Sequence, residues 1–178
     1  MTPLALALAR QPGLWNADRS RTSFAGSPHG QADDILLRFE DLAGVDINAP
    51  DLNEQIDRAP RVWREAWGKL PEVRPIISAL MARVGAFELA RVTITRLSPG
   101  KVIAPHADTQ GSYANSPEGA RYHVVVQGEP GSLFHCGGET VNMRTGDVWW
   151  FNHREVHMVE NNSAQDRIHL LIDLALMT

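Results

Sequence analysis

The sequence has very little cysteine, since Cys136 is the only one among 178 residues. A single cysteine excludes any disulfide within the chain, so a reducing compartment is expected. Long apolar runs are also missing. No span approaches the 18 residues of a membrane helix, and the apolar opening Leu4–Leu8 is short and has no basic stretch before it. We therefore expect a cytoplasmic protein that makes no membrane contact.

Basic runs are absent too. Lysine and arginine number 17 against 21 aspartates and glutamates, which gives a formal net charge of −4. A general nucleic-acid binder normally shows a basic patch or stripe, so no nucleic-acid partner is expected. The chain has neither an internal repeat nor a low-complexity tract. Its 43% hydrophobic and 21% charged residues are ordinary for a globular protein, and we expect residues 1–178 to form a single domain.

The sequence pattern of the chain changes near residue 88, from helical spacing to β-rich runs. Before this point helical spacing dominates, with Trp63, Trp67 and Leu70 at i, i+4 and i+7. We predict two helices with a shared buried face, and a strand over residues 35–39. Residues 1–88 would then form a helical and loop-rich buttress. The second predicted helix follows Pro75 and carries the apolar stripe Ile76, Ile77, Leu80, Met81 and Val84.

After residue 88, short β-rich runs alternate with turn signals. This rhythm is typical of a sandwich or jelly-roll. The predicted fold class is mainly β, a double-stranded β-helix of the jelly-roll, cupin-like kind over residues 89–178. The runs cover residues 91–97, 121–127, 132–135, 140–143, 147–151, 156–160 and 167–174.

The segment from Trp15 to His29 is rich in serine, glycine, arginine and asparagine and predicts a long loop. A loop of this length inside a compact domain is often functional. Two interpretations stay open: a surface connection, or a lid that holds the substrate over an active site. The side chains that such a lid would supply are Trp15, Arg19, Arg21 and His29.

His106-Ala107-Asp108 places two metal-capable side chains two residues apart, just after a strand. In an extended chain both side chains point to the same face. His157, in a distant strand, is the candidate third ligand. Two histidines and one carboxylate on one face of a metal leave three octahedral positions open, which is the arrangement of non-haem Fe(II) oxygenases. An ordinary loop is the plainer interpretation of the first pair, and His153 competes with His157, although His153 sits in a polar turn.

Cationic side chains accompany these ligands. Arg121 and His123 alternate along one predicted strand, so both face the same side. Arg167 begins another strand, whose alternate residues 168, 170 and 172 are apolar. Cations that point into a barrel are costly to bury without an anion, and a dianionic dicarboxylate would satisfy them. The alternative is that both arginines lie on the surface at the starts of their strands.

Four motifs resemble, in order and spacing, the aspartyl/asparaginyl β-hydroxylase family of Fe(II)- and 2-oxoglutarate-dependent oxygenases. The resemblance extends over residues 90–175. It implies that His106 and His157 bind iron, and Asp108 completes a triad whose carboxylate some animal members lack. The stretch Thr109–Ala120 is longer than its counterpart in those members. The motifs are His106-Ala107-Asp108, Arg121-Tyr122-His123, residues 151–157 and residues 167–173.

The resemblance also assigns the co-substrate contacts. Arg167 would pair with the distal carboxylate of 2-oxoglutarate, and the Thr95 hydroxyl would help to hold that carboxylate. Arg121 and His123 would contact the carboxylate nearest the metal. His169 would line the barrel beside Arg167, where packing is its expected role. The chemistry of this class couples oxidative decarboxylation of 2-oxoglutarate to removal of a substrate hydrogen.

Three functions therefore compete. The first is a 2-oxoglutarate-dependent hydroxylase of an amino-acid-like small molecule or peptide, an aspartyl or asparaginyl compound included, with O2 as the oxidant. The second is a metal cupin enzyme that needs no co-substrate and has no reason to place arginines around its metal. The third is a non-enzymatic barrel that binds a dicarboxylate as a sensor and has no need of Asp108 and His157. The sequence does not give the substrate, the hydroxylated carbon or the oligomeric state.

Overall fold

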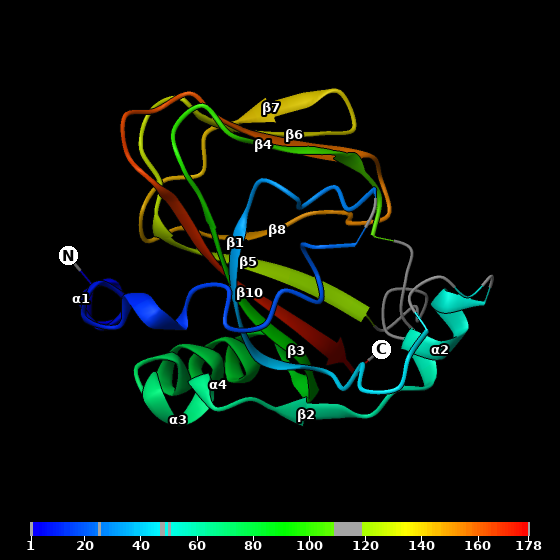
Figure 1. Ribbon diagram of the computed structural model, residues 1–178. Coiled ribbons are helices and arrows are strands. Elements are labelled where there is room, and N and C mark those ends of the chain that lie inside the picture. Colours follow the sequence, from blue (N-terminus) through cyan, green and yellow to red (C-terminus); the bar gives the residue numbers. More distant parts are fainter. Residues whose placement is uncertain (1, 25, 47–48, 50, 109–118, 178) are drawn as a thin grey trace.

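The computed structural model describes residues 2–24, 26–46, 49, 51–108 and 119–177. Most of the long stretch predicted after Asp108 lies outside these residues. Two antiparallel sheets face each other and form the predicted β-helix (Figure 1). The larger sheet has the strand order β2-β1-β3-β10-β5-β8, and the smaller sheet has the order β4-β9-β6-β7.

All seven β-rich runs predicted after residue 88 form strands, so the predicted fold class is confirmed. The larger sheet consists of β1 (Asp33–Glu40), β2 (Arg61–Trp63), β3 (Ala86–Leu97), β5 (Gly119–Gln127), β8 (Val148–Trp150) and β10 (Arg167–Leu176). The smaller sheet consists of β4 (Val102–His106), β6 (Ser132–Cys136), β7 (Glu139–Val141) and β9 (His157–Asn161). Strand β4, which ends at the first predicted metal ligand, is not among the predicted runs.

Helices cover the outer face of the larger sheet, on the side away from the smaller sheet (Figure 1). The Thr2 hydroxyl caps the first helix by accepting from the Ala5 N–H at 3.2 Å. Gly85, with a φ of 69°, ends the last helix in the left-handed conformation. In the described ranges, no helix is long and apolar enough to cross a membrane. The helical segments are α1 (Pro3–Arg10), a 3-10 turn (Pro12–Leu14), α2 (Leu52–Arg58), α3 (Ala66–Lys69) and α4 (Val73–Val84).

The sheet sends its apolar side chains outward to the helices and its polar ones inward. On β10, Leu170 and Ile172 join the outer core together with Leu4 of α1 and Ile77 of α4. Their neighbours in the strand therefore face the smaller sheet. The inward-facing residues of β10 are Arg167, His169, Leu171 and Asp173. A second apolar cluster fills the rest of the interior and includes Leu97, Ile103, Val125, Phe134, Met143 and Val159.

The prediction of two helices before residue 88 is half right. Helix α4 carries the predicted stripe, and it shares one core with Trp67 and Leu70. Trp63, however, lies in β2, where it pairs with Arg38 of β1. The apolar spacing cannot distinguish this strand followed by a single helical turn from a longer helix. Residues 1–88 are also more than a buttress, because they supply β1, β2 and the start of β3.

Candidate metal centre and anion pocket

The three predicted metal ligands lie together where β4 and β9 run side by side. His106 ends β4 and is the antiparallel partner of His157, which begins β9. Asp108 lies two residues after the end of β4, and its backbone N–H donates to the carbonyl of His153 at 2.8 Å. One ligand atom from each of His106, Asp108 and His157 lies within 4.8 Å of the other two. The ring of His153 is not part of this group.

His106 and His157 both turn their Nε2 atom toward Asp108. Nδ1 of His106 donates to the Ala104 carbonyl at 2.8 Å, and Nδ1 of His157 donates to the Glu155 carbonyl at 2.9 Å. A carbonyl oxygen only accepts, so the lone pair of each ring is on Nε2. These Nε2 atoms lie 3.7 and 3.6 Å from the carboxylate oxygens of Asp108. Two imidazole nitrogens and one carboxylate fit a divalent transition metal.

The larger sheet holds Asp108 from the opposite side. Arg121 of β5 donates Nη1 to Oδ2 of Asp108, and its Nε and Nη2 donate to the two oxygens of Asp173 at 2.7 and 2.8 Å. Burial by itself would raise the pKa of Asp108, but the positive charge of Arg121 opposes it and the pKa falls to about 2. Asp108 is therefore ionised at neutral pH and can serve as an anionic ligand.

A pocket between the two sheets joins the predicted metal ligands to the predicted co-substrate residues. It contains all seven side chains that the sequence proposed for the site. The pocket is lined by Arg21, His29, Thr95, Ile103, His106, Asp108, Arg121, His123, Phe134, His157, Val159, Arg167 and Leu171. Three arginines from three separate segments thus converge on one cavity.

Arg167 differs from the other two arginines in its partners. Its side chain is 3% exposed, and in the described part of the chain it has no carboxylate within 4.0 Å. Nη2 of Arg167 donates to Nδ1 of His169 at 3.1 Å. Burial lowers the pKa of Arg167 to about 9, which still leaves it protonated at neutral pH. Because an unpaired buried charge is costly, Arg167 is a candidate binding site for an anionic ligand.

His123 lines the same pocket as this cation and the predicted metal ligands. Its ring packs edge-on against Phe134 and Phe151, with ring centroids 5.7 and 5.0 Å away. Burial lowers its pKa well below the usual value, with Arg167 adding to the effect, so the ring is neutral. Its buried Nδ1 makes no hydrogen bond within the described residues.

Thr95 is already engaged by protein side chains. Its hydroxyl donates to Asp34 at 2.8 Å and accepts from Nη2 of Arg21 at 2.9 Å. Asp34 is 1% exposed and also accepts from Nε of Arg21 at 2.7 Å. A ligand carboxylate at Thr95 would therefore share the hydroxyl with this pair.

The loop from Trp15 to His29 reaches the site. The carbonyl of Pro28 accepts from the Ala104 N–H of β4 at 3.0 Å. The ring of His29 lies edge-on to that of His106, with centroids 4.7 Å apart. Of the four side chains proposed for a lid, Arg21 and His29 line the pocket, whereas Trp15 packs under the guanidinium of Arg96, 4.5 Å from it. Arg19 is not among the lining residues.

Sequence reasoning missed the two carboxylates that hold the pocket arginines. Asp173 could have been found, because the alternation that turned Arg167 inward continues to residue 173 on β10. Asp34 could have been found in the same way: Ile35 and Leu37 of β1 face the outer core, so Asp34 and Leu36 share the inward face. Neither pairing could be foreseen, since Arg21 and Asp34 belong to a loop and a strand whose contact depends on the tertiary fold.

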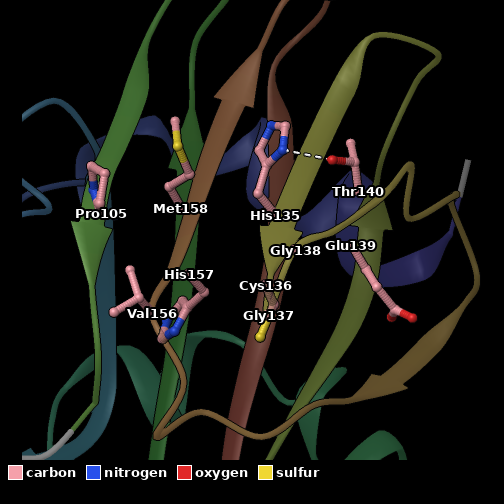
Figure 2. A pocket seen from close by; sticks show the side chains of 10 residues that line it. All are labelled: Pro105, His135, Cys136, Gly137, Gly138, Glu139, Thr140, Val156, His157 and Met158. Carbon is pink, nitrogen blue, oxygen red and sulfur yellow. Dashed lines mark hydrogen bonds between the residues drawn. The ribbon is translucent and has the colours of Figure 1, made fainter.

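A larger hollow of about 310 Å³ lies against β6, β7 and β9 (Figure 2). His135 turns toward Thr140 there, and its Nδ1 lies 2.8 Å from the Thr140 hydroxyl. Cys136, next to it, is half-buried, and burial raises the pKa of its thiol. The lining holds no arginine or lysine. The inner pocket, which has both a ligand triad and cations, is therefore the candidate active site despite its smaller size.

Known proteins match the part of the chain that builds most of this pocket. The family described as "Aspartyl/Asparaginyl beta-hydroxylase" matches residues 54–176. An L-proline cis-3-hydroxylase from a Streptomyces species is 27% identical over 135 residues, which cover 72% of this chain and 46% of that protein. The chain therefore matches less than half the length of this curated relative.

Solved structures of similar shape were also found. One is a predicted oxalate decarboxylase from Thermotoga maritima, with 21% identity over 56% of this chain and 74% of that chain and a TM-score of 0.39. Another is an uncharacterised protein from Klebsiella pneumoniae with a double-stranded β-helix domain. Its identity is 22% over 49% of this chain and 75% of that chain, with a TM-score of 0.37.

Proposed function

Because the chain belongs to the aspartyl/asparaginyl β-hydroxylase family, we propose that it is a non-haem Fe(II)- and 2-oxoglutarate-dependent dioxygenase. Its substrate would be an amino-acid-like small molecule or a peptide residue. One observation carries the proposal: the same pocket holds a histidine–carboxylate–histidine group and, in Arg167, a buried cation with no carboxylate partner among the described residues.

His106, Asp108 and His157 would hold the iron. Their Nε2 lone pairs and ionised carboxylate would supply three ligands, and an octahedral metal would keep three further positions for exchangeable ligands. When bound, iron and 2-oxoglutarate supply the oxidising chemistry, in which O2 is consumed and succinate and CO2 are released. The backbone carbonyls that accept from the two Nδ1 atoms fix the ring orientation, so the chain presents the ligands in advance.

Arg167 would bind the distal carboxylate of 2-oxoglutarate. The guanidinium is buried and charged, and its planar fork matches a carboxylate. The Thr95 hydroxyl would assist at this end, and His123 would donate to the carboxylate nearest the metal. Arg121 would act mainly through Asp108, because Asp173 already takes two of its N–H groups.

The remaining pocket walls would shield the reaction. Phe134, Val159 and Leu171 are apolar and limit the access of water to the reacting atoms. We further propose that the Trp15–His29 loop is a lid and that Arg21 and His29 contact the substrate from it. Residues 1–178 would act as one domain, since this loop lines a pocket whose other walls come from the second half of the chain.

An amino-acid-like substrate follows from the relatives. The family takes its name from aspartyl and asparaginyl residues, and the Streptomyces relative is an L-proline hydroxylase. Both act on amino-acid carbon, so free amino acids and short peptides form the first panel. Succinate release measured across this panel would identify the substrate class.

The proposal is tested by adding Fe(II) and 2-oxoglutarate to the protein without oxygen. Chelation of the metal by the keto acid gives a visible charge-transfer band. We expect the band in the wild-type protein, and we expect it to be lost in His157→Ala and weakened in Arg167→Ala. No band in the wild type would contradict the proposal.

The same titration separates the two alternatives. A metal cupin would bind Fe(II) and remain indifferent to 2-oxoglutarate. A dicarboxylate sensor would bind 2-oxoglutarate, measured by calorimetry, even after His157→Ala. The match to a hydroxylase family over residues 54–176 favours the dioxygenase over both.

A further inference from the structure

A buried histidine stands behind the arginine proposed to bind the co-substrate. Arg167 and His169 are two residues apart on β10, so both side chains point into the barrel. His169 is 0% exposed, and its strand neighbours are Thr95 on β3 and Val125 on β5. The ring of His123 meets it edge-on, with centroids 5.5 Å apart. His169 therefore lies buried behind the pocket wall, next to Arg167, and is not one of the residues that line the cavity.

The hydrogen bond between the two residues has only one possible direction. A guanidinium donates and does not accept, so Nη2 of Arg167 is the donor and Nδ1 of His169 is the acceptor, at 3.1 Å. The ring must then carry its proton on Nε2. Burial and the charge of Arg167 both lower the pKa of His169 well below its usual value, which agrees with a neutral ring.

The hydrogen bond to His169 orients the Arg167 guanidinium without neutralising its positive charge. An aspartate or glutamate behind Arg167 would orient the guanidinium but would also neutralise it, as Asp34 does for Arg21 and Asp173 does for Arg121. A neutral imidazole fixes one N–H group and leaves the positive charge uncompensated. The one pocket arginine proposed to bind a ligand carboxylate is thus the one whose side-chain partner among the described residues is neutral.

We propose that His169 is a positioning residue, which aims Arg167 at the distal carboxylate of the co-substrate and, because it is neutral, leaves the arginine's charge available to that carboxylate. The inference rests on the proposed function and goes beyond it, since it explains how a buried arginine selects a dicarboxylate. The competing role is simple packing, in which the side chain of residue 169 only has to fill its space.

Three variants at residue 169 distinguish the two roles. His169→Asn keeps a neutral acceptor near the position of Nδ1, whereas His169→Asp puts an anion of nearly the same shape there. His169→Leu removes the acceptor and adds no charge. Each protein is titrated anaerobically, with Fe(II) bound, against 2-oxoglutarate and against 2-oxopentanoate, which keeps the chelating end but lacks the distal carboxylate.

We expect His169→Asn to bind 2-oxoglutarate within about threefold of the wild type, because a neutral hydrogen bond is retained. His169→Asp should weaken 2-oxoglutarate by about 100-fold, because the new carboxylate competes for Arg167. His169→Leu should weaken it by about tenfold through loss of orientation. The affinity for 2-oxopentanoate should change by less than about threefold in all three, since that compound does not use Arg167.

The melting temperature of the metal-free variants supplies a second readout. His169→Asp should melt no lower than His169→Asn, since Arg167 gains a counter-ion. Equal affinities of the Asp and Asn variants for 2-oxoglutarate would overturn the inference while leaving the proposed function intact, and so would an equal loss of both keto acids. Absence of the band in the wild type would instead overturn the proposed function.

Discussion

Arg121 and Asp173 face each other on adjacent strands and share two hydrogen bonds, Nε to Oδ1 at 2.7 Å and Nη2 to Oδ2 at 2.8 Å. The remaining Nη1 donates to the proposed metal ligand Asp108. Asp173 therefore fixes the plane of the guanidinium, and the guanidinium fixes one oxygen of Asp108. A carboxylate ligand that is held in this way needs little reorganisation when the metal binds.

Asp173→Asn is expected to weaken metal binding although residue 173 is not a ligand. The amide offers only one acceptor, so the bidentate grip on Arg121 is lost and Asp108 is held less firmly. We expect the affinity for Fe(II), or for Co(II) as a spectroscopic substitute, to fall by about 10- to 100-fold.

The control for Asp173→Asn is the same change at Asp166, which is half-exposed and lies just before β10. Asp166→Asn should bind the metal like the wild type. If Asp173→Asn also binds the metal like the wild type, then Asp108 does not depend on the Arg121–Asp173 pair.

The two histidines that compete for the third ligand position give a direct test. His157→Ala should lower the affinity for Co(II) by at least about 100-fold, because it removes an Nε2 lone pair from the site. His153→Ala should keep the affinity within about threefold, because the main-chain carbonyl that accepts from Asp108 is retained. The ring of His153 is buried, so this variant should unfold at a lower temperature. Loss of metal from His153→Ala and not from His157→Ala would reverse the assignment.

The strand pattern of the second half could be predicted because its cause is local. The β-rich runs are separated by turn-forming residues, and these short-range signals mark where each strand begins and ends. Strand β4 was missed because it is short and ends in Pro105-His106, where proline offers no N–H to a ladder. Trp63 was misplaced because β2 exists only through its pairing with β1.

The site could be predicted as a set of residues but not as a network. His106, Asp108 and His157 were identified by type and spacing, and the structure brings them within reach of one another. The partner of each arginine could not be identified, because charge pairing depends on tertiary contacts. Arg121 pairs with a residue 52 positions away, and Arg21 reaches Thr95 across 74 positions.

The contact of the loop with the pocket can be tested through Arg21 and Asp34. This ion pair is largely buried, with side chains 14% and 1% exposed. Arg21→Met leaves the Asp34 carboxylate without its counter-ion and should lower the free energy of unfolding by about 3 kcal/mol. In the double variant Arg21→Met with Asp34→Asn, the loss should be smaller than the sum of the single losses by about 1–3 kcal/mol. Urea unfolding of the four proteins measures this coupling.

The control for that cycle is the pair of Arg58 with Glu54. Both side chains are exposed, at 77% and 66%, and they lie four residues apart on α2. The same kind of cycle there should give a coupling of about 0.5 kcal/mol or less. A coupling of that size at Arg21 and Asp34 would mean that the loop is not anchored by this pair.

The buried neutral ring of His169 also predicts a dependence of stability on pH. Its pKa is lowered in the folded protein, so between the usual value of 6.5 and the folded value the unfolded chain binds one more proton. This contribution to stability is present above pH 6.5 and is lost as the pH falls below it. Between pH 7 and pH 5 the metal-free wild type should lose more stability than His169→Asn, by up to about 2 kcal/mol.

Urea unfolding of both proteins at pH 5, 6, 7 and 8 checks this prediction. From pH 7 to pH 8 the two proteins should change in parallel, because the histidine is then neutral in the folded and unfolded chains alike. A separation that opens only below pH 6.5 identifies the proton taken up by residue 169 on unfolding. Parallel curves over the whole range would mean that His169 gains its proton at the same pH in the folded and the unfolded chain. A ring that is protonated this easily beside a guanidinium is not the acceptor of Arg167, and the guanidinium would then be oriented by some other group.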